Sequence, residues 1–372
     1  MSEDANSNSL IALNILRLVE SAYHIHDPEI EDSPISVSQL PPAGASEDAR
    51  IYRYLGRFQI FATSSDLPFE PNTVIEITSD RSVFDAFDLL VHHNVLSMPI
   101  RDPQSGAYLG LIDMVDLVHL AMTSFDQAKL TDLASLTGSA DSIFVGSLAD
   151  AANISSFNPF VAVPNGVALL AVMRLLGERG LRRICVTDND GQVTGIISQS
   201  WLVRWLNIHK LAPGADLMNA TVADLALVSG PDLVVSVPDN ALAADAFKAM
   251  VDNGVTSCAI VDSNDGTLVT VVSVRDLKVL RGSGTEETDH QQSFSFTALF
   301  APIMDFVSAS RMQNLVTFPA VVGVRPTATL GTVIAKFAST GLHRVFVVDD
   351  KRMPVGVISL GDVIRTIPTR SQ

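Results

Sequence analysis

Cysteine, charge and long apolar runs are all scarce in this sequence of 372 residues. Its two cysteines, Cys185 and Cys258, are too few for a disulfide framework or a cysteine-rich metal site. Each lies in an apolar, strand-like run, which predicts a buried free thiol. Only 18% of the residues are charged and 47% are hydrophobic, so we expect most of the chain to fold around a large core.

The sequence also offers little to a membrane or a nucleic acid. Its longest helical apolar run, residues 167–176, is interrupted by Arg174 and is too short to cross a bilayer. The first nine residues are polar and acidic, whereas a signal peptide is basic and then apolar. The formal net charge of -16 repels nucleic-acid backbones and anionic lipids. We therefore expect a cytoplasmic and/or nuclear protein with neither nucleic acid nor membrane among its partners.

Enzyme motifs are missing as well. The sequence contains no nucleophile elbow, no phosphate-binding Gly-Lys-Ser/Thr loop and no zinc-ligand spacing. His92 and His93 are adjacent, so on a helix they point to different faces and cannot hold one metal ion together. We expect a protein that is not an enzyme, and that has no metal and no cofactor beyond regulatory ligands.

Four internal repeats are the main feature that is present. Each reads as a helix, a short strand ending in Asp, a turn, a second strand and another helix. The residue that opens the last helix lies 160 positions apart in repeats one and three (Asp113, Ser273) and 161 apart in repeats two and four (Ser198, Ser359). The repeating unit is therefore a pair. The repeats occupy residues 74–123, 158–208, 232–281 and 316–367, in two modules at 71–209 and 231–367.

Two other segments differ from the repeats. Residues 1–50 combine a stretch with helical apolar spacing, 10–22, and an acidic linker rich in Pro and Ser. That helix either packs on the modules of its own chain or docks on a partner. Residues 282–293 are polar and charged, and we expect them to form a mobile loop inside the second module.

A hydroxyl or carboxyl group followed three residues later by Asp recurs at the start of the last helix. Repeat four has it in GVISLGD, residues 356–362. A hydroxyl beside a carboxylate suits the two vicinal hydroxyls of a ribose, and the same spacing also makes an ordinary helix capping box. Repeat two breaks the pattern, because the residue three positions after Ser198 is Trp201 instead of Asp. The candidate ribose ligands are Asp113, Asp116, Ser273, Asp276, Ser359 and Asp362.

Basic pairs precede the inner strand of the even-numbered repeats. Repeat two has Arg182 and Arg183, and repeat four has His343 and Arg344. We place Ser97-Met98 and Ser257-Cys258 at the corresponding positions of the odd repeats. Guanidinium groups fit phosphate oxygens, and a protonated histidine adds a charged donor. The alternative is that these are surface cations paired with some of the many acids.

The repeat with its G-h-h-S-x-x-D ending resembles the CBS domain, and four copies in two Bateman modules resemble the gamma subunit of AMP-activated protein kinase and its fungal and plant relatives. HRVFVVDD…GVISLGDVI is similar to the last repeat of that family. The ending IISQSWLVRWL of repeat two also resembles fungal phosphatase-regulating tandem-CBS proteins. The resemblance covers about four-fifths of the chain.

The resemblance implies an α+β fold in which four CBS repeats form two Bateman modules, arranged as a disk with pseudo-two-fold symmetry and nucleotide clefts near its centre. The acids and serines above would contact ribose, and Arg182, Arg183, His343 and Arg344 would contact phosphate. Two basic residues of the kinase family are replaced here by Leu96 and Ser200, which weakens the site of the first module.

Two functions follow from these observations. The first is an energy-sensing regulatory subunit that binds AMP, ADP and ATP competitively and acts on the catalytic and scaffold subunits of a protein kinase. The second is an interaction scaffold of the phosphatase-regulating type, with vestigial ligand sites. The first depends on the complete motifs of the second module, and the second on Leu96 and Ser200.

Overall fold

The computed structural model describes residues 59–60, 74–127, 148, 160–209, 215–228, 230–280, 296–313 and 323–369. Residues 1–50 and the loop at 282–293 lie outside the described residues, so the predictions for them stay predictions. No helix in the described ranges is both long enough and apolar enough to cross a membrane.

Each repeat has the same order of strand, helix, strand, strand and helix. Repeat one has β2 (Ile77–Thr78), α3 (Val83–His92), β3 (Ser97–Arg101), β4 (Tyr108–Asp113) and α4 (Met114–Gln127). Repeat two has β5 (Ala162–Pro164), α6 (Leu169–Glu178), β7 (Arg183–Thr187), β8 (Val193–Ser198) and α7 (Gln199–His209). Repeat three has β9 (Ser236–Pro238), α9 (Ala243–Asp252), β10 (Ser257–Val261), β11 (Leu268–Ser273) and the 3₁₀ helix η7 (Val274–Leu280). Repeat four has β12 (Gly323–Val324), α11 (Leu330–Thr340), β13 (Arg344–Val348), β14 (Pro354–Ser359) and α12 (Leu360–Thr369).

Six further elements of the described residues lie outside this common order. They are β1 (Gln59–Ile60), which pairs with β6 (Val167–Ala168), α8 (Ala215–Asn219), η6 (Pro231–Leu233), η8 (Phe296–Phe300) and α10 (Ile303–Gln313). The last of these, α10, packs against η7 and α9 of repeat three.

Every repeat forms one three-stranded sheet with its inner strand in the middle. The first strand runs parallel to the inner strand and the last strand runs antiparallel to it. Three consecutive residues at the centre of each inner strand are buried, as the continuous apolar runs predict for a strand that is covered on both faces. The ladder shifts register near the outer end of all four hairpins.

The first helix of a repeat is set by its cap and by its apolar spacing. In α3, Ser82 and Asp85 form a reciprocal capping box, and the buried residues Val83, Ala86, Phe87 and Leu90 follow the i, i+3, i+4, i+7 spacing. In repeat four, α11 is capped by Thr329 and ends at Gly341, whose φ of 65° is the left-handed conformation that favours glycine.

The two repeats of a module pack through their sheets. In the first module, Leu111 of β4 packs with Cys185 and Val193 of repeat two. In the second, Ala259, Leu268 and Val271 of repeat three pack with Phe346 and Val357 of repeat four. Each repeat thereby covers the sheet face that its neighbour would leave in water.

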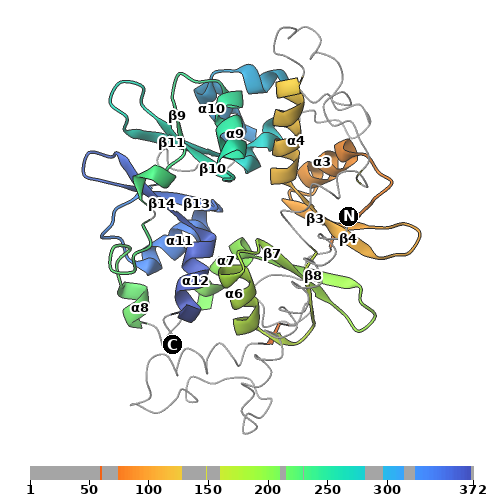
Figure 1. Cartoon of the computed structure of the whole chain (residues 1–372). Helices are drawn as coiled ribbons and strands as arrows, with labels where there is room; N and C mark the ends of the chain where they lie inside the picture. The colour runs from red at the N-terminus through yellow and green to blue at the C-terminus, as the bar shows by residue number, and fades with distance from the viewer. Residues whose placement is uncertain are drawn as a thin grey trace, which may run out of the picture.

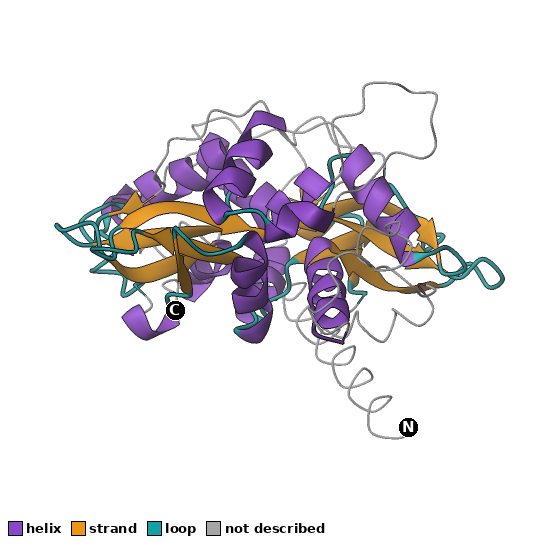
Figure 2. Ribbon diagram, turned by 90° about the horizontal axis from the view of Figure 1, so that it is seen from above, coloured by secondary structure: helices purple, strands orange, loops and turns teal. Residues whose placement is uncertain are grey.

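The two modules pack through their helices. A core of buried residues joins repeats two and four around α6, α7, α11 and α12, and a second core joins repeats one and three around α4 and α9. Figure 1 shows the four repeats arranged around a common centre, with α6 beside α12 and α4 beside α9. The turned view in Figure 2 shows a flattened molecule with strands towards both ends and helices between them.

Candidate nucleotide site

Strand pairing shows which residues of the four repeats are equivalent. The residue that opens the last helix pairs across the hairpin with the first residue of the inner strand: Ser97 with Asp113, Arg183 with Ser198, Ser257 with Ser273, and Arg344 with Ser359. The basic pairs therefore correspond to Leu96-Ser97 and Thr256-Ser257 in the odd repeats, one position earlier than the sequence comparison placed them.

All three Ser/Asp–Asp motifs form caps at the start of the last helix. The backbone N–H of Asp113, Ser273 and Ser359 donates to Oδ2 of the Asp three residues later, over 2.7 to 2.8 Å. The hydroxyls of Ser273 and Ser359 donate to the same oxygen. The structure thus contains the helix caps that the alternative interpretation predicts. The three motifs differ in the surroundings of the other carboxylate oxygen.

In the second module, Ser273 and Asp276 line a cavity of about 270 Å³ between repeats three and four. Oδ1 of Asp276 accepts a 2.6 Å hydrogen bond from the hydroxyl of Ser310 on α10. Gly341 and Leu342 line it from repeat four, and they also line a second, small pocket that includes His343.

Three arginines surround the same cavity. Arg204 comes from α7 of repeat two, Arg275 from η7 and Arg311 from α10. Arg275 donates to the carbonyl oxygen of Gly341 over 3.3 Å, and Arg311 hydrogen-bonds Thr270. Burial, together with the charge of Arg204, lowers the pKa of Arg275. Asp276 is the one acid among the cavity-lining residues, so this wall is electropositive in a strongly acidic chain.

A buried lysine lies next to this wall. Lys278 of η7 is 6% exposed and donates to Oδ1 of Asn94 in repeat one over 2.9 Å. Burial first, and then the charge of Arg275, lowers the pKa of Lys278 to about 7. An anion bound in the cavity would favour the protonated lysine.

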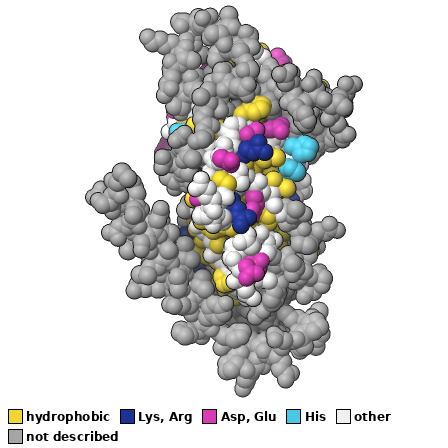
Figure 3. All heavy atoms as spheres, turned by 90° about the vertical axis from the view of Figure 1, so that its right-hand side faces the viewer, with side chains coloured by type: hydrophobic (Ala, Val, Ile, Leu, Met, Phe, Trp, Pro, Cys, Tyr) yellow, Lys and Arg dark blue, Asp and Glu magenta, His cyan; other side chains and the backbone are white. Residues whose placement is uncertain are grey.

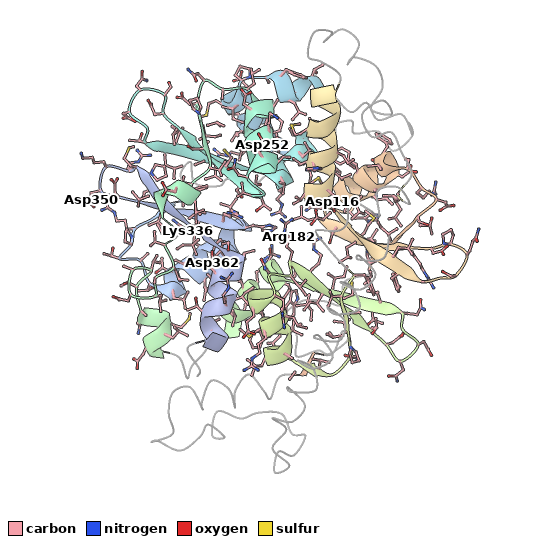
Figure 4. The ribbon with its side chains drawn as sticks, viewed as in Figure 1. Asp116, Arg182, Asp252, Lys336, Asp350 and Asp362 are labelled. Atoms are coloured by element: carbon pink, nitrogen blue, oxygen red, sulfur yellow. The ribbon has the colours of Figure 1, made fainter. Side chains whose placement is uncertain are left out.

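In the first module the predicted ribose and phosphate ligands contact each other. The side chain of Asp113 is 1% exposed, and its Oδ2 lies 3.5 Å from Nη1 of Arg182 and 3.5 Å from Nη2 of Arg183. Asp116 is 2% exposed, and burial together with the charge of Asp113 raises its pKa to about 8. Figure 4 places Arg182 near the centre of the molecule, with Asp116 on α4 beside it.

His343 is partly buried, and its surroundings disfavour the protonated imidazole. Burial, followed by the charges of Arg275, Arg183 and Arg182, lowers its pKa to about 3. Its Nε2 shares a 3.0 Å hydrogen bond with the hydroxyl of Ser200. The sequence suggested a protonated histidine as phosphate donor, whereas the surrounding arginines hold the imidazole neutral.

Arg344 and Asp362 lie together in repeat four. The charge of Asp362 partly offsets the burial that lowers the pKa of Arg344, and Asp362 is also 3.6 Å from Arg365. Ser359, Asp362 and Arg344 do not line the cavity that contains Asp276. The predicted second-module residues are therefore divided between two places, and only Ser273 and Asp276 line the large cavity.

The chain matches the CBS domain family at residues 152–206, 231–280 and 316–369, which cover repeats two, three and four. Repeat one has the same elements in the same order and the same strand register. The chain is a tandem-CBS protein.

Similar proteins include fungal relatives and an archaeal protein of known structure. The tandem-CBS chain is 26% identical to Protein SDS23 of Meyerozyma guilliermondii over 81% of this chain and 59% of that protein, and 28% identical to SDS23 of Yarrowia lipolytica over 84% and 61%. It thus spans about three-fifths of the length of these relatives. Protein MJ1225 of Methanocaldococcus jannaschii, described as a proposed archaeal homologue of γ-AMPK, superposes with a TM-score of 0.59 at 13% identity, over 80% of this chain and 96% of that one. This likeness shows the fold.

The three cavity arginines were not among the residues predicted from sequence. Arg275 lies inside the SVRD motif, and Arg204 interrupts the apolar helix WLVRWL. Both positions are unusual enough to be noticed, but residue spacing does not indicate that they line a ligand site. Arg311 lies in α10, between repeats three and four, and nothing in the sequence around it indicates a site. Among the described residues, no group of three or more His, Cys, Asp or Glu is placed to hold a metal ion.

Proposed function

We propose that this tandem-CBS protein is a non-catalytic regulatory protein that binds an adenine nucleotide, AMP, ADP or ATP, in the cavity of its second module. The observation that carries the proposal is the cavity itself, which is lined by the Ser273–Asp276 pair together with Arg204, Arg275 and Arg311. A carboxylate is suited to a sugar diol, and guanidinium groups are suited to phosphate oxygens.

The charge balance of the cavity supports an anionic ligand. Three arginines line it against one acid, and the nearby Lys278 donates to the neutral amide oxygen of Asn94. Groups of like charge raise each other's energy when they are partly removed from water. A bound phosphate group would relieve this repulsion, whereas a neutral nucleoside would not.

We propose an interaction scaffold as the role of the whole protein, with the kinase regulatory subunit as the second candidate. The curated relatives are fungal SDS23 proteins, which favours the fungal tandem-CBS type, and the first module pairs its own candidate ligands with each other. The γ-AMPK likeness and the cavity favour the kinase subunit. Crosslinking of the tagged full chain in cytoplasmic and nuclear extracts would distinguish them, because a scaffold captures a phosphatase complex and a γ-type subunit captures kinase catalytic and scaffold subunits.

Isothermal titration of the full chain with AMP, ADP and ATP tests the ligand proposal. We expect one nucleotide in the cavity, and a loss of at least about tenfold in affinity for Asp276→Asn, because a hydrogen bond to a charged group contributes about 1.5–3 kcal/mol. The matched control is Asp362→Asn, which changes the equivalent residue of repeat four outside the cavity.

Two results would count against the nucleotide site. The first is a folded wild-type protein that binds none of the three nucleotides at millimolar concentration. The second is equal weakening by Asp276→Asn and Asp362→Asn, which would place the ligand elsewhere.

A further inference from the structure

One position distinguishes the first repeat from the other three. The residue that opens the last helix is Ser198, Ser273 or Ser359 in repeats two to four, and it is Asp113 in repeat one. Both oxygens of the Asp113 carboxylate are engaged. Oδ1 accepts from the backbone N–H of Val115 over 2.7 Å and of Asp116 over 3.1 Å, and so caps α4 as a serine hydroxyl would.

The second oxygen of Asp113 has no counterpart on a serine. It lies at 3.5 Å from both Arg182 and Arg183, the basic pair of repeat two. One carboxylate oxygen between two guanidinium groups is the arrangement that a phosphate oxygen would adopt there. Nε of Arg183 is also buried and has no hydrogen-bond acceptor among the described residues, so a donor remains for a larger anion.

The two modules differ in charge as expected from Asp113 in the first and serine in the second. In the first, Arg182 and Arg183 share Asp113 as their counter-ion, and the buried Asp116 lies beside Asp113. In the second, the equivalent residue is Ser273, and three arginines with one acid border an open cavity. Mixed acidic and basic side chains also occupy the described part of the outer face in Figure 3, whereas the unbalanced cations lie at the second-module cavity.

We propose that Asp113 is a built-in counter-ion that keeps a polyphosphate site at Arg182 and Arg183 closed, and that replacing it with the serine of the other repeats opens the site. The ligand class is a phosphate chain, either free or carried by a nucleotide. The side chain of Arg182 is 31% exposed, so the group contacts solvent through this residue. The inference concerns the first module and does not require the nucleotide proposed for the second.

The test is a titration of the full chain with inorganic tripolyphosphate and, separately, with ATP. We expect Asp113→Ser to bind one more molecule per chain than the wild type, however many the wild type binds. The added binding should disappear in Asp113→Ser/Arg182→Ala and persist in Asp113→Ser/Asp276→Asn. Binding of both probes would assign the site to phosphate groups alone, and binding of ATP alone would add a requirement for the nucleoside.

Two further variants keep the test decisive. Asp113→Asn preserves the size of the side chain and its capping oxygen while removing the charge, so it serves if the serine variant does not fold, and it should also gain binding. Asp80→Asn removes the same charge at an exposed position and should behave like the wild type. If folded Asp113→Ser and Asp113→Asn bind the same number of probe molecules as the wild type, the counter-ion proposal is wrong, whether or not the second-module cavity binds nucleotide.

Discussion

At the scale of single residues, burial decides what the two thiols can do. Cys185 and Cys258 are each 0% exposed, and burial raises the pKa of both to about 12. The thiolate is the reactive form, so raising the pKa from 9 to 12 lowers its population at pH 8 by about a thousandfold. These residues are packing groups in the sheet cores.

We predict that an aromatic disulfide reagent at pH 8 labels neither cysteine of the native chain and labels both in guanidinium. The measurement is the absorbance of the released thiolate over one hour. Ser105→Cys, which places a thiol on an exposed turn, is the positive control and should react within minutes. Rapid labelling of one native thiol would show that its sheet opens.

Lys278 gives a second prediction, on pH. Its pKa is about 7 in the folded chain and 10.5 in its ordinary state, so the unfolded chain holds more protons between these values. The free energy of unfolding should therefore rise with pH across this window, with a limiting slope of about 1.4 kcal/mol per pH unit. Lys278→Met should remove this rise and stabilise the protein at pH 7 and below.

Urea unfolding at half-unit steps from pH 6 to pH 10 measures this slope. The control is Lys248→Met, which alters a half-exposed lysine paired with Asp252 at 3.8 Å and should leave the slope unchanged. A wild-type slope that survives in Lys278→Met would mean that another group releases the proton.

Spacing along the sequence identified Ser273 and Asp276 because both lie in one helix turn, where contacts are local. It did not identify Arg204 or Arg311, because these residues of α7 and α10 come to the same cavity as Asp276 only after distant segments have packed. The lowered pKa of His343 was also not predictable, since it depends on burial in the folded chain and then on arginines from repeats two and three. Site residues from one local motif could therefore be predicted, whereas residues that come together from distant segments could not.

At the scale of elements, the turn after α11 connects the fold to the cavity. Gly341 has a φ of 65°, and a Cβ there would lie 2.9 Å from Nη1 of Arg275. Gly180, after α6 in repeat two, has nearly the same φ of 67° but has no atom within 4 Å of such a Cβ. Alanine at Gly180 would therefore show the cost of the left-handed backbone alone, whereas alanine at Gly341 would add a steric contact with Arg275.

We predict that Gly341→Ala and Gly180→Ala both lower the free energy of unfolding by about 1–2 kcal/mol, because the left-handed conformation is strained with a Cβ. Only Gly341→Ala should also weaken nucleotide binding, since it displaces Arg275. Thermal unfolding and titration of both variants check this. Equal affinity in the two variants would show that Arg275 does not contact the ligand.

Element types and order were predictable from apolar periodicity and turn residues, and the strand register placed the four repeats in one alignment. Two details were not predictable. The last helix of repeat three is a 3₁₀ helix, whereas its equivalents are α-helices. The basic pairs align one position earlier than the Ser97-Met98 and Ser257-Cys258 pairs chosen from sequence. Strand register depends on pairing with the neighbouring strand, so a one-residue shift cannot be detected from a single strand.

At the scale of the whole molecule, the contact between α6 and α12 holds repeats two and four together. A Cβ on Gly177 would lie 3.0 Å from the backbone nitrogen of Arg365, so the glycine allows the two helices to approach closely. Arg365 in turn donates to the carbonyl oxygen of Gly177 over 3.3 Å. The number of repeats was predictable from the sequence, whereas the pairing of their helices was not.

We predict that Gly177→Val separates the modules on one side and lowers the free energy of unfolding by about 1–3 kcal/mol, the usual cost of overpacking. Small-angle scattering should show a larger radius of gyration, and α12 should lose protection from hydrogen exchange. Gly230→Val, where nothing lies within 4 Å, is the control. An unchanged radius together with unchanged protection would mean that the interface tolerates the added side chain.

Sheet contacts join repeat one to two and three to four, and helix contacts join one to three and two to four. Each repeat therefore has two neighbours, and the contacts close into a ring. An open array of repeats has terminal units that fray and need polar caps. A ring has no terminal unit, so loss of any one repeat breaks two interfaces at once, and we expect the described repeats to unfold together in a single transition.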